Sequence, residues 1–159
     1  MSQALIELDI GYHVIGVTDD SQRFAQAARW IANRCGLRSL TASISIVDDD
    51  TIHYLNRTRL DHDWPTDVIS FVFENQAGVV DGELIASADT ASRVCVEAGW
   101  SATDELLLYV VHGLLHLAGL DDVDAAQQRE MRQMESDCLA SLSVPGAQEH
   151  VARWYEISN

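Results

Sequence analysis

Alternating hydrophobic and polar residues predict strands in the first half of the chain. In residues 6–10, Ile6, Leu8 and Ile10 alternate with acidic residues, and residues 40–47 repeat the pattern. A period of two places every second side chain on one face of a strand, so both segments are predicted to be half-buried strands. Residues 67–73, DVISFVF, are rich in β-branched and aromatic residues and predict a buried strand. A fourth strand is expected over 82–87, after a turn.

Helical spacing predicts helices between and after these strands. Residues 22–35 carry apolar side chains at that spacing and are followed by Gly36. A short helix is expected from the aspartates at 48–50 through Leu55, and another over 90–98, ending at Gly99. Strands early and helices late indicate one α+β domain over residues 1–159. We expect a small mixed sheet packed against a buried helix.

The helix predicted over residues 101–118 is apolar on nearly every side and is therefore expected to be central. Ser101 and Asp104 resemble a capping box at its start, and Gly119 suits the position after its end. Asp124 with Gln127 predicts the start of a last long helix. Its core-facing stripe is Met131, Met134, Cys138 and Leu142.

The end of the central helix carries the segment HGLLHLAGLDD, residues 112–122. His112 and His116 are four residues apart and share one helix face, where two imidazoles can reach one ion at about 2.0 Å. Gly119 lets the chain turn back, and Asp122 then stands at the spacing of the third ligand in metzincin zinc sites. Asp121 and Asp124 remain alternative third ligands. The competing explanation is that both histidines are packed core residues.

The residue at position 113 distinguishes a zinc protease from other metal-dependent hydrolases. In zinc proteases with this spacing, the residue after the first histidine is a glutamate that activates the metal-bound water. Here it is Gly113, which cannot accept a proton. The ordinary protease mechanism is therefore not expected from this helix.

Composition and charge bear on the possible binding partners and on the cellular compartment. The formal net charge is −15, and all ten basic residues are arginines. This charge repels nucleic acid at long range but allows a local arginine-lined groove. The apolar stretch 106–120 is too short and polar to span a bilayer. The first residues lack the pattern of a signal peptide, and the three cysteines are far apart, so we expect a cytoplasmic protein without a membrane segment.

Three segments together resemble the YbeY-type rRNA maturation factors, which are single-strand-specific metallo-endoribonucleases of bacteria. HGLLHLAGLDD follows the family's H-G-x-L-H-L-x-G-Y-D-H until its end. Residues 55–71, LNRTRLDHDWPTDVISF, resemble L-N-x-x-Y-R-x-x-D-x-P-T-D-V-L-S-F. Residues 82–87, GELIAS, are similar to G-D-I-x-I-S, and the three segments occur in the family's order.

The resemblance implies a metallohydrolase-like α+β fold and one Zn²⁺ per chain, held by His112, His116 and Asp122. It implies cleavage of single-stranded rRNA in 16S rRNA 3′-end maturation and ribosome quality control, with the small ribosomal subunit as partner. The oligomeric state is left open.

Two positions depart from the family pattern. Asp122 stands where the family has its third histidine, and Leu60 aligns with the family's catalytic arginine. The nearest substitutes are Arg59 and Arg57. We therefore predict His112 and Arg59 as catalytic residues, and Arg57 and Arg59 as substrate-binding residues. The alternative for both arginines is a solvated loop.

Two other functions remain compatible with the residues. The first is a metalloprotease-like hydrolase, which the metzincin-like spacing favours and Gly113 opposes. The second is a ribosome-associated binding protein with a structural zinc, which Leu60 and the acidic charge favour.

Overall fold

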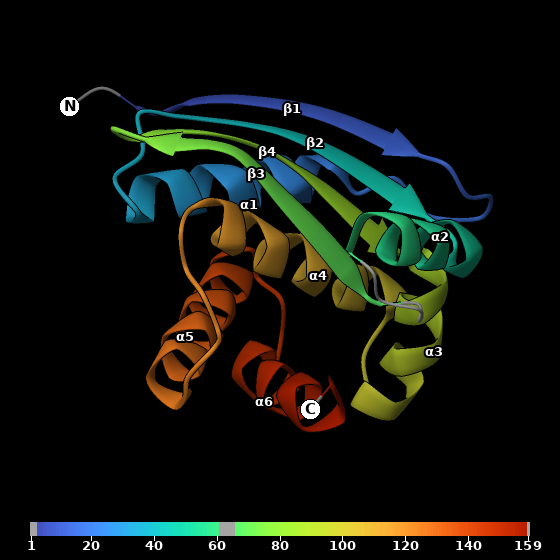
Figure 1. Cartoon of the computed structure of the whole chain (residues 1–159). Coiled ribbons are helices and arrows are strands. Elements are labelled where there is room, and N and C mark those ends of the chain that lie inside the picture. The colour runs from blue at the N-terminus through green and yellow to red at the C-terminus, as the bar shows by residue number, and fades with distance from the viewer. Residues whose placement is uncertain (1–2, 61–65, 159) are drawn as a thin grey trace.

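The structure, a computed structural model, describes residues 3–60 and 66–158. Residues 61–65, part of the segment similar to the family's second motif, lie outside the described residues. The described residues form four strands and six helices (Figure 1): β1 (Leu5–Tyr12), α1 (Ser21–Arg34), β2 (Ser39–Val47), α2 (Asp49–Leu60), β3 (Val68–Gln76), β4 (Val79–Ser87), α3 (Ala88–Ala98), α4 (Ala102–Leu117), α5 (Ala125–Ser141) and α6 (Ala147–Ser158).

The four strands form one mixed sheet in the order β1-β2-β4-β3. β1 pairs with β2 and β2 with β4 in parallel, whereas β3 runs antiparallel to β4. Parallel neighbours need a crossover connection, which α1 provides between β1 and β2. β3 and β4 are joined by Ala77 and Gly78, whose φ angles of 53° and 80° fit a two-residue hairpin turn. The α+β class with a small mixed sheet is as predicted.

The two faces of the sheet carry separate groups of buried side chains. Leu84 and Ala86 of β4 belong to the main core, together with the buried side chains of α1 and α4. Ile85 of β4 and Ile69 of β3 point to the other face and pack with Ile52 of α2 in a smaller cluster. Successive side chains alternate between the faces of a strand, so α4 and α2 cover opposite faces. In Figure 1 the sheet lies above α1 and α4, with α5 and α6 below α4.

α4 is the central helix that its composition predicts. Twelve of its sixteen residues are buried. The Ser101 side chain accepts a hydrogen bond from the backbone N–H of Asp104 at the helix start, as the capping pattern indicates. Gly119 follows the last turn with a φ of 107°, a left-handed conformation that suits glycine and lets the chain leave the helix. The segment that follows can therefore turn back toward the face of α4.

α5 also begins as predicted, because Asp124 and Gln127 form a complete capping box. Met131 and Cys138 are fully buried, and Met134 and Leu142 pack against the core.

The prediction that this helix is the last one was wrong, since α6 follows it. α2 continues to Leu60 instead of ending near Leu55, and β4 begins at Val79, three residues earlier than Gly82.

None of the helices within residues 3–60 and 66–158 is both long and apolar enough to cross a membrane.

Candidate metal centre

His112 and His116 lie on one face of α4, near its C-terminal end. His112 is buried, with 8% of its surface exposed, and His116 is partly buried. Their Nε2 atoms are 3.0 Å apart, and the two rings meet edge to face with centroids 4.6 Å apart. The helical spacing of four residues thus brings two ring nitrogens to one point.

The outer nitrogen of each ring faces a hydrogen-bond acceptor. His112 Nδ1 lies 2.9 Å from Oε2 of Glu135, a fully buried residue of α5. His116 Nδ1 lies 3.0 Å from the backbone carbonyl oxygen of Leu120. Because a carboxylate and a carbonyl only accept, each Nδ1 carries the proton in the neutral ring, and each Nε2 carries a lone pair. With both rings neutral, the two Nε2 lone pairs face one another at 3.0 Å, an arrangement that a cation between them would stabilise.

Asp122 completes a group of three. Its Oδ2 lies 3.7 Å from His112 Nε2 and 3.8 Å from His116 Nε2. Ligand atoms of the three residues all lie within 4.8 Å of one another. Two ligands bound at about 2.0–2.1 Å in a tetrahedral zinc site are roughly 3.3 Å apart. The donor set and its spacing therefore fit one zinc-class ion with a fourth position open.

The two alternative third ligands have other roles. An Asp121 side-chain oxygen accepts the backbone N–H of Asp122, and the Asp124 side chain accepts that of Gln127 at the start of α5. Asp122 is thus the aspartate that joins both histidines in the described part of the chain.

The two imidazoles differ electrostatically. Burial, the largest single effect, lowers the pKa of His112, but the hydrogen bond and charge of Glu135, together with the charges of Asp67 and Asp122, outweigh it and raise the pKa. Burial, and then the neighbouring His112, lower the pKa of His116. His116 is therefore kept neutral, with its Nε2 lone pair available to a cation.

Glu135 is a residue beside the metal group that was not predicted from the sequence. It accepts from His112 across 23 residues of chain and fixes the ring's tautomer and direction. Carboxylates in this position commonly orient metal-bound histidines. A signal was present in the sequence, because Glu135 follows Met131 by four residues and precedes Cys138 by three. It interrupts the apolar stripe of α5 at a buried position.

The two predicted arginines lie on α2. Arg59 Nη1 is 3.7 Å from Glu83 Oε1, and its guanidinium lies 5.4 Å from the Phe71 ring centroid. Phe71 and Glu83 are cross-strand partners on the face of the sheet that α2 covers. Arg57 lies 6.0 Å from the Tyr54 ring. The structure thus groups His112, His116 and Asp122, and places Arg59 on the opposite face of the sheet.

Gly113 is packed against the sheet and does not face the metal group. A Cβ atom at this position would lie 2.6 Å from Leu84 Cδ2, closer than side chains approach. Leu84 is itself fully buried. A glutamate at position 113 would have to enter this contact, so the packing as well as the sequence opposes a protease-type base here.

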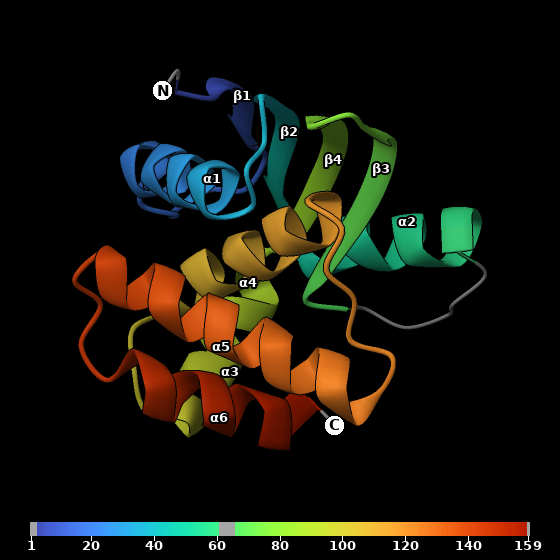
Figure 2. The same cartoon turned by 90° about the vertical axis from the view of Figure 1, so that its left-hand side faces the viewer.

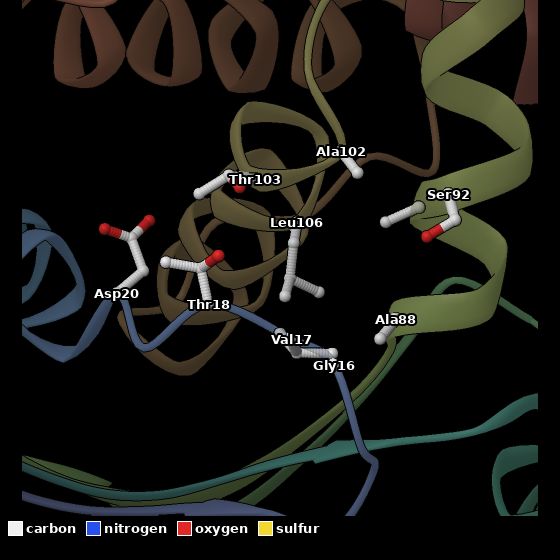
Figure 3. Close-up of a pocket in the computed structure, with 10 residues that line it drawn as sticks. Gly16, Val17, Thr18, Asp20, Ala88, Ser92, Ala102, Thr103 and Leu106 are labelled. Carbon is white, nitrogen blue, oxygen red and sulfur yellow. The ribbon is translucent and has the colours of Figure 1, made fainter.

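A separate cavity of about 230 Å³ lies near the opposite, N-terminal end of α4 (Figure 3). Small and hydroxyl-bearing side chains line it, including Thr18, Ala88, Ala91, Ser92, Ala102 and Thr103, with Leu106. Among the described residues its lining contains no histidine or cysteine, so it is distinct from the metal group.

Together, the mixed sheet, the buried central helix and the His₂Asp group define a metallohydrolase-like α+β protein. The family model for "Endoribonuclease YbeY" matches residues 14–143, and the chain belongs to this family. It is 46% identical over 122 residues to the endoribonuclease YbeY of Rhodopirellula baltica, covering 76% of this chain but 63% of that protein. The Aquifex aeolicus protein of that name is 34% identical over 128 residues, covering 79% of this chain and 83% of its own length.

Two further comparisons extend over almost the whole chain. The Novosphingobium aromaticivorans endoribonuclease YbeY is 31% identical over 159 residues, covering 91% of this chain and 95% of that protein. The solution structure of a Thermotoga maritima protein matches with a TM-score of 0.61 at 21% identity, over 89% of this chain and 95% of that one. At that identity the match supports the fold alone.

Proposed function

We propose that this protein is a zinc-dependent, single-strand-specific endoribonuclease that acts in 16S rRNA 3′-end maturation and ribosome quality control. The observation that carries the proposal is the pair of Nε2 atoms 3.0 Å apart, with the Asp122 carboxylate beside them, in a chain of the YbeY family. The relatives named above bear the name endoribonuclease. RNA as the substrate follows from that name.

In the proposed mechanism, His112, His116 and Asp122 would hold the ion. When bound, zinc supplies a Lewis acid for a phosphoryl oxygen and lowers the pKa of water. Glu135 holds the Nδ1 proton of His112, and the Leu120 carbonyl holds that of His116, so neither ring has to reorient during the reaction. Asp122 adds a negative charge, which offsets part of the charge of a dication.

Arg59 is the proposed arginine for the charge on the phosphate, and Arg57 a proposed phosphate contact. Because α2 lies on the sheet face opposite α4, an RNA strand held at the metal group would have to pass around the edge strand β3 to reach them. Arg59 is half-exposed, and its 3.7 Å ion pair with Glu83 is weak enough to exchange for a phosphate. Loss of one donor to a developing charge typically costs about 10²–10³ in rate. Arg59→Ala is expected to lose about that factor without loss of metal, and Arg57→Ala to lose less.

The proposal includes the setting of the enzyme. We infer one domain over residues 1–159 that works in the cytoplasm on the small ribosomal subunit. Because the net charge is −15, RNA is expected to bind through a short local groove. The affinity for RNA should then fall only modestly as the salt concentration rises, because binding releases only a few counterions.

The test offers zinc-loaded protein three substrates: a single-stranded rRNA fragment, the same sequence as a duplex, and casein. We expect cleavage of the single strand alone, and no cleavage by His116→Ala. His13→Ala, which removes an exposed histidine beside β1, is the matched control and should cleave normally.

Cleavage of casein that His116→Ala abolishes would instead identify a protease. No cleavage of any of the three substrates would favour a binding protein with a structural metal.

A further inference from the structure

A β-bulge in the edge strand β3 presents an aromatic side chain to solvent. Val72 pairs with Gly82 and Glu74 pairs with Asp81, so the pairing register shifts between them and Phe73 has no cross-strand partner on β4. Phe73 is 64% exposed. Bulges redirect side chains and occur often beside active sites.

The bulge lies against the last turn of α4, which also carries His116. Gly82, the partner of Val72, is so close to this turn that a Cβ there would lie 2.5 Å from Leu117 Cδ2. Asn75 Nδ2 donates to the carbonyl oxygen of Leu117, 3.3 Å away. Residues 72–75 therefore run alongside the residues that directly follow His116. Figure 2 shows the end of α4 beneath the sheet edge that β3 forms.

We propose that Phe73 is the stacking platform for one unpaired base of the RNA strand held at the metal centre. This inference rests on the proposed function and names the feature by which the site would select single strands. A base inside a duplex is stacked on its neighbours and cannot cover the ring, whereas an unpaired base can. Stacking on an aromatic ring also tolerates any base, because every base has a flat face that can cover the ring.

The acidic charge of the protein favours a contact of this kind. With 25 acidic residues against ten arginines, the protein attracts the phosphate backbone less than a basic protein does. A contact that does not depend on charge can supply the missing affinity.

The size of the apolar surface favours a single base over a protein partner. Val72 is half-exposed beside Phe73, but the strand continues with the exposed polar residues Glu74, Asn75 and Gln76. A stable protein interface buries roughly 800 Å² on each partner, far more than these two side chains offer. One flat ring bordered by polar groups matches one base.

The test uses the zinc-loaded protein and a short single-stranded RNA, 2′-O-methylated to resist cleavage, with 2-aminopurine scanned through its positions. Stacking on a ring changes the emission of 2-aminopurine, so one position should respond in the wild type and not in Phe73→Ala. Phe73→Ala should weaken binding about tenfold, and Phe73→Trp should retain it. With cleavable RNA, the KM should rise and kcat should stay within about twofold.

Leu5→Ala is the matched control, since Leu5 is an exposed apolar residue of β1, the other edge strand. It should bind as the wild type does. An RNA that lacks the base at the responding position should bind the wild-type protein about tenfold more weakly than intact RNA does. Phe73→Ala should bind this RNA and intact RNA equally well.

Wild-type affinity in Phe73→Ala, or an equal loss from the missing base in both proteins, would overturn the stacking role and leave the proposed function standing. A wild-type protein that binds no RNA would overturn both.

Discussion

Glu135→Gln removes the charge behind His112 and nearly preserves the shape of the side chain. Glu135 is fully buried, and its Oε2 lies 2.9 Å from His112 Nδ1. The amide can still accept a hydrogen bond from Nδ1–H, but it no longer offers a negative charge to the imidazole. The ring should therefore donate less electron density to a metal at Nε2.

The size of the effect follows from this one contact. A hydrogen bond to a charged group contributes about 1.5–3 kcal/mol, and one between neutral groups about 0.5–1.5 kcal/mol. The difference of roughly 1–1.5 kcal/mol corresponds to about a tenfold change in an equilibrium constant. We expect zinc to bind Glu135→Gln about tenfold more weakly than wild type, within the range of about 10–100-fold found for such partners.

The assay is competition for zinc between the protein and a chromophoric chelator. Glu130→Gln is the matched control, because it removes the same charge from an exposed position of α5. It should bind zinc as the wild type does. Equal affinities for Glu135→Gln and wild type would refute the orienting role of Glu135, and an equal loss in both variants would assign the effect to overall charge.

Three further predictions concern individual side chains. Asp122→His should tighten zinc binding, since a third imidazole replaces a carboxylate that lies 3.7 and 3.8 Å from the two Nε2 atoms. Gly113→Ala should lower the free energy of unfolding by roughly 1 kcal/mol, because crowding of Leu84, at about 1–3 kcal/mol, outweighs the gain of about 1 kcal/mol in helix propensity. Burial raises the pKa of Glu105, so the folded state keeps a proton that the unfolded chain releases above its ordinary pKa near 4.5. Stability should fall as pH rises above that value, by about 1.4 kcal/mol for each pH unit over which folded Glu105 stays protonated, and Glu105→Gln should flatten this slope.

The same measurements can contradict these expectations. Weaker zinc binding by Asp122→His would count against Asp122 as a ligand. A more stable Gly113→Ala protein would show that the Leu84 side chain can move aside without loss of stability. Parallel pH–stability curves for wild type and Glu105→Gln would assign the slope to other groups.

The sheet and the central helix could be predicted because their patterns are local. Residues 6–10 and 40–46 alternate strictly, and β1 and β2 contain them. Residues 101–118 combine an N-terminal cap with an apolar run and a glycine stop, and α4 occupies 102–117. In these segments the period, the cap and the burial all indicate the same element.

Two helices were predicted only in part or not at all. α2 continues past Leu55 through NRTRL, where Asn56 is buried and the following residues are exposed, so apolar spacing could not show its end. In α6, Ala147 and Val151 are buried four residues apart, and no helix was predicted over these residues. Tertiary packing stabilises both helices more than their own sequences do.

The residues of the candidate site also fall into two groups, those that the sequence could place together and those that it could not. His112, His116 and Asp122 lie within one turn of helix and one loop, so their spacing in the sequence fixes their proximity. The contact of Glu135 with His112 depends on how α5 packs on α4, which spacing along the chain does not determine. The place of Arg59, on the face of the sheet opposite α4, likewise follows from the path of α2.

Titration of metal-free protein with zinc, followed by the rate of single-stranded RNA cleavage, tests the central claim most directly. We predict a rate that rises in proportion to zinc until His112, His116 and Asp122 hold one equivalent per chain, and then stays constant. His116→Ala should show no rise at any zinc concentration. Cleavage that proceeds without zinc in the presence of a chelator, or that His116→Ala retains, would contradict the account.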